Sequence, residues 1–302
     1  MKTFAAALLI ASAALVPAAS AQGITQFNIG ILGGENAQDR LTNQECYRAR
    51  IEAELGVPVK VFTPADYDGV IQGLLGGTLD MAWLGASGYA KIFLTNGDAV
   101  EVVLTKQNVD GSTGYYSIGF ARKDSGITSL EGAKGKKFAF AEPNSTSGYL
   151  VPGAEMVASV GKLEEFFSEV KFSGGHEQSI VGVANGDFDA AVAWADGLGN
   201  WEDGYNSGAF RRASDAGLVD MNDLVEIWKS KLIPEGPMVV RKALPQDVKD
   251  KVTKLTADLH ETDRKCAYGV AAGEARDFVP VTHAEYEGVV AARKLQESAR
   301  KN

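Results

Sequence analysis

The chain has 302 residues, with 39 acidic and 30 basic side chains and a formal net charge of −9. This excess of acid argues against nucleic acid as a partner, because binding to its phosphates needs clustered lysines and arginines. The length suffices for one large domain or for two lobes of ordinary size. The chain has only three histidines and no motif with metal-ligand spacing, so we expect no metal site and no cofactor.

Residues 1–21 have the pattern of a cleavable secretory signal peptide. Lys2 supplies a positive charge, residues 5–16 form a short apolar run, and Ala19-Ser20-Ala21 is a small-residue cleavage signal. We therefore expect an exported chain, located in the periplasm of a bacterium. An uncleaved anchor is the alternative interpretation, but no stop-transfer pattern follows the apolar run.

In chain order, strand-like and helix-like patterns alternate. The expected strands are 25–32, 57–62, 79–84, 99–106, 115–122 and 137–141, and the expected helices include 43–55, 64–75, 149–160 and 248–269. This alternation predicts an α/β fold with helices layered over mostly parallel sheets.

A weak internal repeat indicates how the chain is organised. The pattern Gly-x-x-Asp-x-Ala, followed by a strand that closes with tryptophan, occurs at 77–83 and again at 186–194. The spacing is too long for a solenoid and suits two similar lobes, although two short βα units can also resemble each other by chance. Two lobes without catalytic motifs suggest a protein that binds its ligand in the cleft between them.

The run Ser145-Thr146-Ser147 lies between an apolar strand and a helix. Three hydroxyl groups and the unsatisfied N–H groups of a helix N-terminus form a receptor for a phosphate-like or carboxylate-like group. The simpler interpretation is an ordinary N-cap supplied by Asn144 or Ser145.

The chain contains two cysteines, Cys46 and Cys266. Export to an oxidising compartment and an even count favour a disulfide between them, and two buried reduced cysteines are the alternative.

Several segments together are similar to a known family. They are 64–73, 80–83, 114–117, 143–153, 175–177 and 228–234, and the most specific is Pro-Asn-Ser-Thr-Ser-Gly-Tyr-Leu-Val-Pro-Gly at 143–153. Over nearly all of its mature length the chain resembles the periplasmic phosphonate-binding proteins (phosphate, phosphite or phosphonate) of ABC importers. The resemblance implies a two-lobed type II periplasmic binding fold with a hinge, a monomer, and delivery of the ligand to a permease with its ATPase. A signalling receptor could replace the importer.

The resemblance also implies a set of ligand-binding residues. The phosphonate group would be held by Tyr67, Tyr115, Ser145, Thr146, Ser147 and His176. Hydroxyl, phenol and imidazole groups can each donate to its oxygens. Without the family, Tyr67 could be a surface aromatic, Tyr115 a core residue and His176 part of a turn.

In relatives that bind 2-aminoethylphosphonate, acidic side chains meet the ammonium group. Asp196 stands where such a relative has glutamate, whereas Glu235 lies one residue before the usual acid, because the chain reads Ile-Pro-Glu-Gly-Pro at 233–237. We therefore expect 2-aminoethylphosphonate as the ligand, with phosphite, phosphate or another phosphonate as alternatives.

An enzyme is the competing class of function. Ser145 or Ser147 could combine with His176 and Asp189 in a hydrolase acting on a phosphoryl or acyl group, but no nucleophile elbow is present. We expect a binding protein rather than an enzyme. Its lobes are expected at 22–120 and 121–236, with a return to the first lobe and C-terminal helices over 237–302.

Overall fold

The computed structural model describes residues 23–33 and 37–299. The predicted signal peptide, residues 1–21, lies outside the described residues. Within the described part of the chain, every helix is too short or too polar to span a bilayer.

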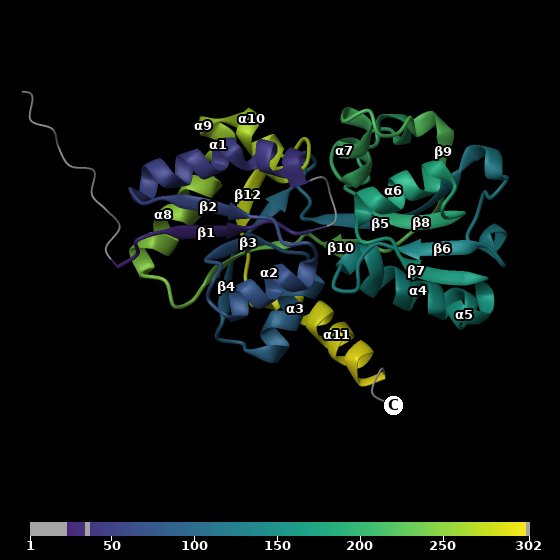
Figure 1. Cartoon of the computed structure of the whole chain (residues 1–302), viewed down its shortest axis with the longest axis horizontal. Coiled ribbons are helices and arrows are strands. Elements are labelled where there is room, and N and C mark those ends of the chain that lie inside the picture. Colours follow the sequence, from purple (N-terminus) through teal and green to yellow (C-terminus); the bar gives the residue numbers. More distant parts are fainter. Residues whose placement is uncertain (1–22, 34–36, 300–302) are drawn as a thin grey trace, which may run out of the picture.

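The first lobe is built on a six-stranded sheet in the order β12-β4-β11-β3-β1-β2 (Figure 1). Its strands are β1 (Phe27–Gly30), β2 (Val59–Phe62), β3 (Met81–Trp83), β4 (Val100–Gln107), β11 (Pro237–Arg241) and β12 (Asp277–Pro280). β1 pairs in parallel with β2 and β3. The other pairs in this sheet are antiparallel.

The second lobe repeats this strand order. Its sheet runs β10-β5-β8-β6-β7, with β9 also paired to β5. The strands are β5 (Gly114–Arg122), β6 (Lys137–Phe140), β7 (Glu169–Phe172), β8 (Ala190–Ala195), β9 (Leu224–Lys229) and β10 (Ile233–Pro234). The series β7-β6-β8-β5 corresponds to β2-β1-β3-β11, so the weak sequence repeat reflects two lobes of the same construction.

The α/β class and the two-lobed type II fold are confirmed, but the sheets are mixed rather than mostly parallel. β4 carries the chain out of the first lobe, and β11 brings it back in the opposite direction beside β4. β5 likewise enters the second sheet antiparallel to β8 and β9. Parallel neighbours need a helical crossover within one lobe, and strands that join the lobes have none.

Helices cover both faces of each sheet (Figure 1). In the first lobe they are α1 (Ala37–Leu55), α2 (Tyr67–Leu75), α3 (Ala86–Thr95), α8 (Gln246–Ala257), α9 (Leu259–Thr262), α10 (Arg264–Ala271) and α11 (Glu287–Ala299). In the second lobe they are α4 (Val151–Val160), α5 (Leu163–Phe166), α6 (His176–Asn185) and α7 (Ala209–Asp215). Each lobe has two apolar clusters, which bury the apolar stripes of the helices against the sheet.

A disulfide joins Cys46 on α1 to Cys266 on α10, with 5.8 Å between the two Cα atoms. The expectation of a disulfide is confirmed, and the alternative of two reduced thiols is excluded. The expected single helix over 248–269 is divided into α8, α9 and α10. Asp263 begins α10, where its side chain accepts a hydrogen bond from the backbone N–H of Cys266 (3.1 Å).

The two aspartates of the repeat have the same structural role. The carboxylate of Asp80 accepts the backbone N–H of Asn28 in β1, and that of Asp189 accepts the backbone N–H of Lys137 in β6, each at 2.8 Å. Asp80 therefore fixes β1 against β3, and Asp189 fixes β6 against β8. This use of Asp189 gives it a structural purpose in place of the hydrolase role considered above.

Two crossings connect the lobes. The first covers 108–113 between β4 and β5, and the second is Glu235-Gly236 between β10 and β11. They contact each other, since the N–H of Glu235 donates to the carbonyl of Thr113 (2.9 Å). Because the whole of β5 pairs within the second sheet, a division at residue 120 would cut this strand, and the first crossing precedes it.

Candidate ligand-binding site

A cavity of about 190 Å³ lies between the lobes, lined from both lobes and from the second crossing. Seven of the eight residues expected at the site line it: Tyr67, Tyr115, Ser145, Thr146, Ser147, His176 and Glu235. Asp196 does not belong to the described lining. The volume exceeds the ~30 Å³ that one water occupies in the liquid, so a small organic anion fits.

The Ser145-Thr146-Ser147 run is both a helix cap and a cavity wall. Ser145 precedes the π-helical turn η3 (Thr146–Leu150), and its Oγ accepts the N–H of Gly148 at 2.9 Å. The turn continues directly into α4. Thr146 and Ser147 therefore stand at the start of a continuous helix, where backbone N–H groups lack intrahelical acceptors and favour an anion. The N-cap interpretation is confirmed for Ser145, and the anion receptor stays a prediction.

His176 begins α6 and is buried against Ser145, with 3.1 Å between its Nε2 and the Ser145 Oγ. Burial lowers the pKa of His176 to about 3, so the ring is neutral near pH 7. Ser145 Oγ accepts the N–H of Gly148 and keeps one proton to donate, and we assign this proton to Nε2 of the imidazole. The ring proton then lies on Nδ1, which is buried and has no partner among the described residues.

Two tyrosines add phenol groups to the cavity wall. Tyr67 is the first residue of α2, where Asp66 caps the helix through the N–H of Gly69 (2.9 Å). Tyr115 lies on β5, with its ring edge-on to Trp194 at 5.7 Å between centroids. Burial raises the pKa of Tyr115 more than hydrogen bonds to Ser147 and Thr146 lower it. This phenol therefore stays protonated and can act as a donor.

The two acids expected on the far side have different surroundings. Glu235 lines the cavity, and its Oε1 lies 2.8 Å from Lys106 Nζ. That oxygen is outside hydrogen-bonding geometry, so the contact is a charge pair. Asp196 is turned into its own loop, where Oδ1 accepts the N–H of Leu198 at 3.1 Å. Burial raises the pKa of Asp196, and its Oδ2 has no partner within the described part of the chain.

Lys106 was missed at the sequence level. It lies near the end of β4, is buried, and lines the cavity. Its Nζ donates to Ser207 Oγ (2.9 Å) and lies 5.3 Å from the centre of the Trp194 ring. The available signal was a lysine in an apolar strand directly before a crossing between lobes, where a cation would face the cleft.

Much of the remaining wall is apolar. Trp83 and Phe278 pack with 5.0 Å between ring centroids and their planes tilted by 42°, and Trp194 lines the cavity from the second lobe. Tyr89 does not belong to the described lining, and its hydroxyl lies 2.7 Å from Nδ1 of His283. Trp83 Nε1 is a second buried ring nitrogen that lacks a partner in the described structure. The wall thus combines apolar surface with donors that have no acceptor.

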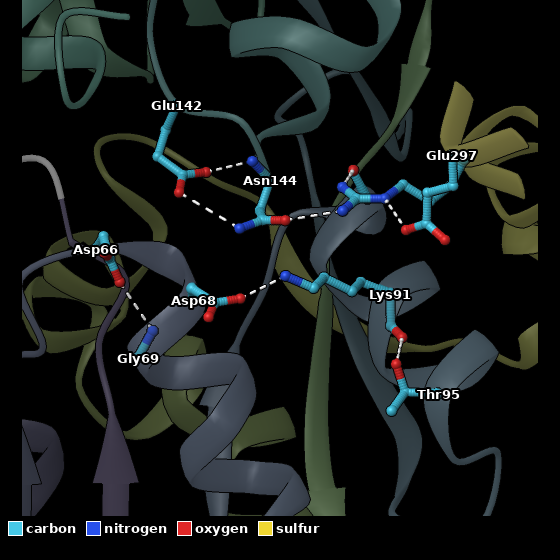
Figure 2. Close-up of polar contacts among 10 residues, drawn as sticks. Asp66, Asp68, Gly69, Lys91, Thr95, Glu142, Asn144 and Glu297 are labelled. Carbon is cyan, nitrogen blue, oxygen red and sulfur yellow. Dashed lines mark hydrogen bonds and ion pairs between the residues drawn. The ribbon is translucent and has the colours of Figure 1, made fainter. Parts of the chain in front are cut away.

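The lobes are closed over the cavity by contacts on one side. Thr146 Oγ1 accepts the N–H of Ser87 in α3 (2.8 Å). Arg293 of α11 donates to Ser87 Oγ (3.0 Å) and to Asn144 Oδ1 (2.9 Å). Figure 2 shows this region, in which Asn144 also contacts Glu142 of its own lobe. α11 therefore connects the first lobe to the segment that carries the three hydroxyl residues.

Contacts on another side of the cleft are made by the backbone. The N–H of Gly208 donates to the carbonyl of Ala272, and the N–H of Glu274 donates to the carbonyl of Asn206, each at 3.1 Å. We call residues 206–208 and 272–274 the backbone clasp. The chain is thus in a closed arrangement.

Among the described residues, no group of three or more histidine, cysteine, aspartate or glutamate side chains could hold a metal ion.

The comparisons with known proteins agree with this geometry. The family described as "ABC transporter, phosphonate, periplasmic substrate-binding protein" matches residues 29–286. The chain belongs to this family. Its members are substrate-binding proteins of ABC transporters and not enzymes, so the hydrolase alternative is set aside. The family resemblance seen in the sequence is confirmed.

Individual relatives are named for different ligands. The chain is 33% identical to the phosphonates-binding periplasmic protein of Escherichia coli, over 80% of this chain and 68% of the relative. It is 28% identical to the phosphate-import protein PhnD of Mycolicibacterium smegmatis, over 89% of this chain and 86% of the relative.

Solved structures show the same fold. The binding protein of an ABC phosphonate transporter from Pseudomonas aeruginosa is 26% identical, with a TM-score of 0.76 over 90% of this chain and 86% of that one. The PhnD1 protein of Prochlorococcus marinus, solved with methylphosphonate, is 18% identical, with a TM-score of 0.75 over 90% of this chain and 98% of that one. The latter similarity supports the fold alone.

Proposed function

We propose that this binding protein captures a phosphonate in the cavity between its lobes and delivers it, in the periplasm, to an ABC importer. The observation that carries the proposal is a neutral, buried His176 whose Nδ1 has no partner in the described structure, beside Ser145. A buried donor without an acceptor is costly. An oxyanion in the cavity would satisfy it.

A charged ligand needs many hydrogen-bond donors from the cavity wall. A phosphonate carries up to two negative charges near neutral pH, and each oxygen removed from water needs replacement hydrogen bonds. The hydroxyls of Ser145, Thr146 and Ser147, two phenols, one imidazole and the helix N–H groups are the candidates. Thr146 Oγ1 accepts the N–H of Ser87 and keeps one proton that it can donate.

The apolar wall supports a ligand with a carbon substituent. Trp83, Phe278 and Trp194 would contact carbon on phosphorus, whereas the fourth oxygen of phosphate would need a further polar partner. We therefore favour a phosphonate over inorganic phosphate as the ligand.

2-Aminoethylphosphonate is the second candidate, and Asp196 is the observation in its favour. Its Oδ2 is buried without a partner in the described structure, and an ammonium could balance its charge. However, Glu235 is already paired with Lys106, and Asp196 does not belong to the described lining. An amine would have to compete with a lysine of the chain itself.

Calorimetric titration tests the proposed function. Methylphosphonate, 2-aminoethylphosphonate, phosphite and phosphate would be titrated into the wild-type chain and into Ser145→Ala. Loss of charge-assisted bonds should weaken phosphonate binding about 10- to 100-fold in this variant. Ser159→Ala, on the exposed face of α4, is the matched control. Absence of phosphonate binding to the wild type, or equal binding by Ser145→Ala, would contradict the proposal.

A further inference from the structure

We propose that Lys106 is a specificity-determining residue, an ammonium supplied by the chain that excludes ligands with an ammonium of their own. This inference rests on the proposed function and names the substrate class of the same site. That class is phosphonates whose carbon substituent bears no positive charge.

The contacts of Lys106 are those that a protein offers to an amine. Its Nζ lies 2.8 Å from the Glu235 carboxylate, donates to the Ser207 hydroxyl at 2.9 Å, and lies 5.3 Å from the centre of the Trp194 ring. A carboxylate, a hydroxyl and an aromatic face are the groups that recognise a ligand ammonium. The lysine therefore uses the recognition groups that an aminophosphonate would need.

The charges of the wall lead to the same conclusion. Glu235 is the single acidic side chain in the described lining, and Lys106 pairs with it. The positive charge of Lys106 also lowers the pKa of Asp196 and so offsets part of the effect of burial. A second ammonium would meet no uncompensated carboxylate in this wall, and it would be repelled by the first.

Lys106 discriminates only when the lobes are closed. It belongs to β4 of the first lobe, whereas Ser207 and Trp194 belong to the second. Closure thus brings the lysine to its final position and shuts the far side of the cavity around it. A ligand with an alkyl group would place carbon against Trp83 and Phe278, which form the nearby apolar wall.

Two ligands of equal size test the inference by calorimetry. Propylphosphonate and 2-aminoethylphosphonate have the same number of heavy atoms and differ at one terminal atom, carbon or nitrogen. We expect the wild-type chain to bind propylphosphonate at least about tenfold more tightly, because of the like-charge repulsion. Lys106→Met frees Glu235 and should reverse the preference. Lys60→Met, on an exposed part of β2, is the control and should retain it.

A double variant protects the test against misfolding. Lys106→Met leaves a buried acid without its partner, so Lys106→Met with Glu235→Gln, a neutral pair, is measured as well. It should bind propylphosphonate and lose most of the discrimination. Equal or tighter binding of 2-aminoethylphosphonate by the wild type, or an unchanged preference in both Lys106 variants, would overturn the inference. A wild-type chain that binds no phosphonate would instead overturn the proposed function.

Discussion

Tyr67 and His176 occupy the same position in the two lobes. Each is the first residue of the helix that follows a corresponding strand, α2 after β2 in the first sheet and α6 after β7 in the second. Both side chains line the same cavity. The internal repeat therefore places two unlike donors, a phenol and an imidazole, on opposite walls of the site, and each lobe contributes a helix start to a ligand held between them.

The buried His176 predicts a pH dependence of stability. Its folded-state pKa of about 3 lies below its unfolded value of 6.5. Between these pH values the unfolded chain binds the proton and the folded chain does not. The contribution of His176 to the free energy of unfolding therefore falls as pH decreases from 6.5 towards 3. The contribution changes by at most about 1.4 kcal/mol per pH unit.

Urea unfolding of the unliganded chain at pH 7 and pH 5 measures this effect, with His176→Gln for comparison. Wild type should lose more stability than the variant over this interval. The raised pKa values of Glu142 and Asp196 are common to both chains and cancel in the difference. Parallel pH dependences of the two chains would show that His176 does not carry the effect.

Ala272 is a strained residue at the backbone clasp. It has a φ of +66° at the end of α10, in the left-handed region that favours glycine. Ala272→Gly should therefore raise the free energy of unfolding by about 0.5–1 kcal/mol. Ala271→Gly, at the last residue of α10, should lower it by about 0.5–1 kcal/mol. If both variants lost stability equally in thermal unfolding, the strain at Ala272 would be refuted.

Arg293 predicts a link between α11 and ligand affinity. Arg293→Met keeps an unbranched apolar stem but removes the bond to Asn144, which joins the lobes, and the bond to Ser87 within the first lobe. The closed population should fall, and affinity for a phosphonate should decrease about tenfold. Small-angle scattering should show a less compact unliganded variant. Lys294→Met, exposed on the same helix, should behave as wild type; an Arg293→Met variant with wild-type affinity and compactness would disprove the link.

The sequence contained enough to predict the fold class, the disulfide and the hydroxyl-lined end of the cavity. The position of the Ser145-Thr146-Ser147 run could be predicted because the strand, the helix cap and the helix follow one another directly in the sequence. The ion pair of Lys106 and Glu235 could not be predicted from local sequence. It forms because the end of β4 lies beside the second crossing, which comes much later in the chain.

Asp196 and the first lobe boundary show where local patterns were insufficient. The N–H of Leu198 turns the Asp196 carboxylate into its own loop, so its position along the chain did not place its side chain at the wall. The first crossing precedes β5, because β5 finds its partners in β8 and β9. The sequence of one strand alone does not indicate which distant strand it pairs with.

The most direct test of phosphonate capture is a crystal structure of the chain grown with methylphosphonate. The account predicts that the three phosphonate oxygens contact the Ser145, Thr146 and Ser147 hydroxyls, the two phenols of Tyr67 and Tyr115, and Nδ1 of His176, with the methyl group towards the apolar wall. A phosphonate bound elsewhere, or one in the cavity that leaves His176 Nδ1 without an acceptor, would contradict it.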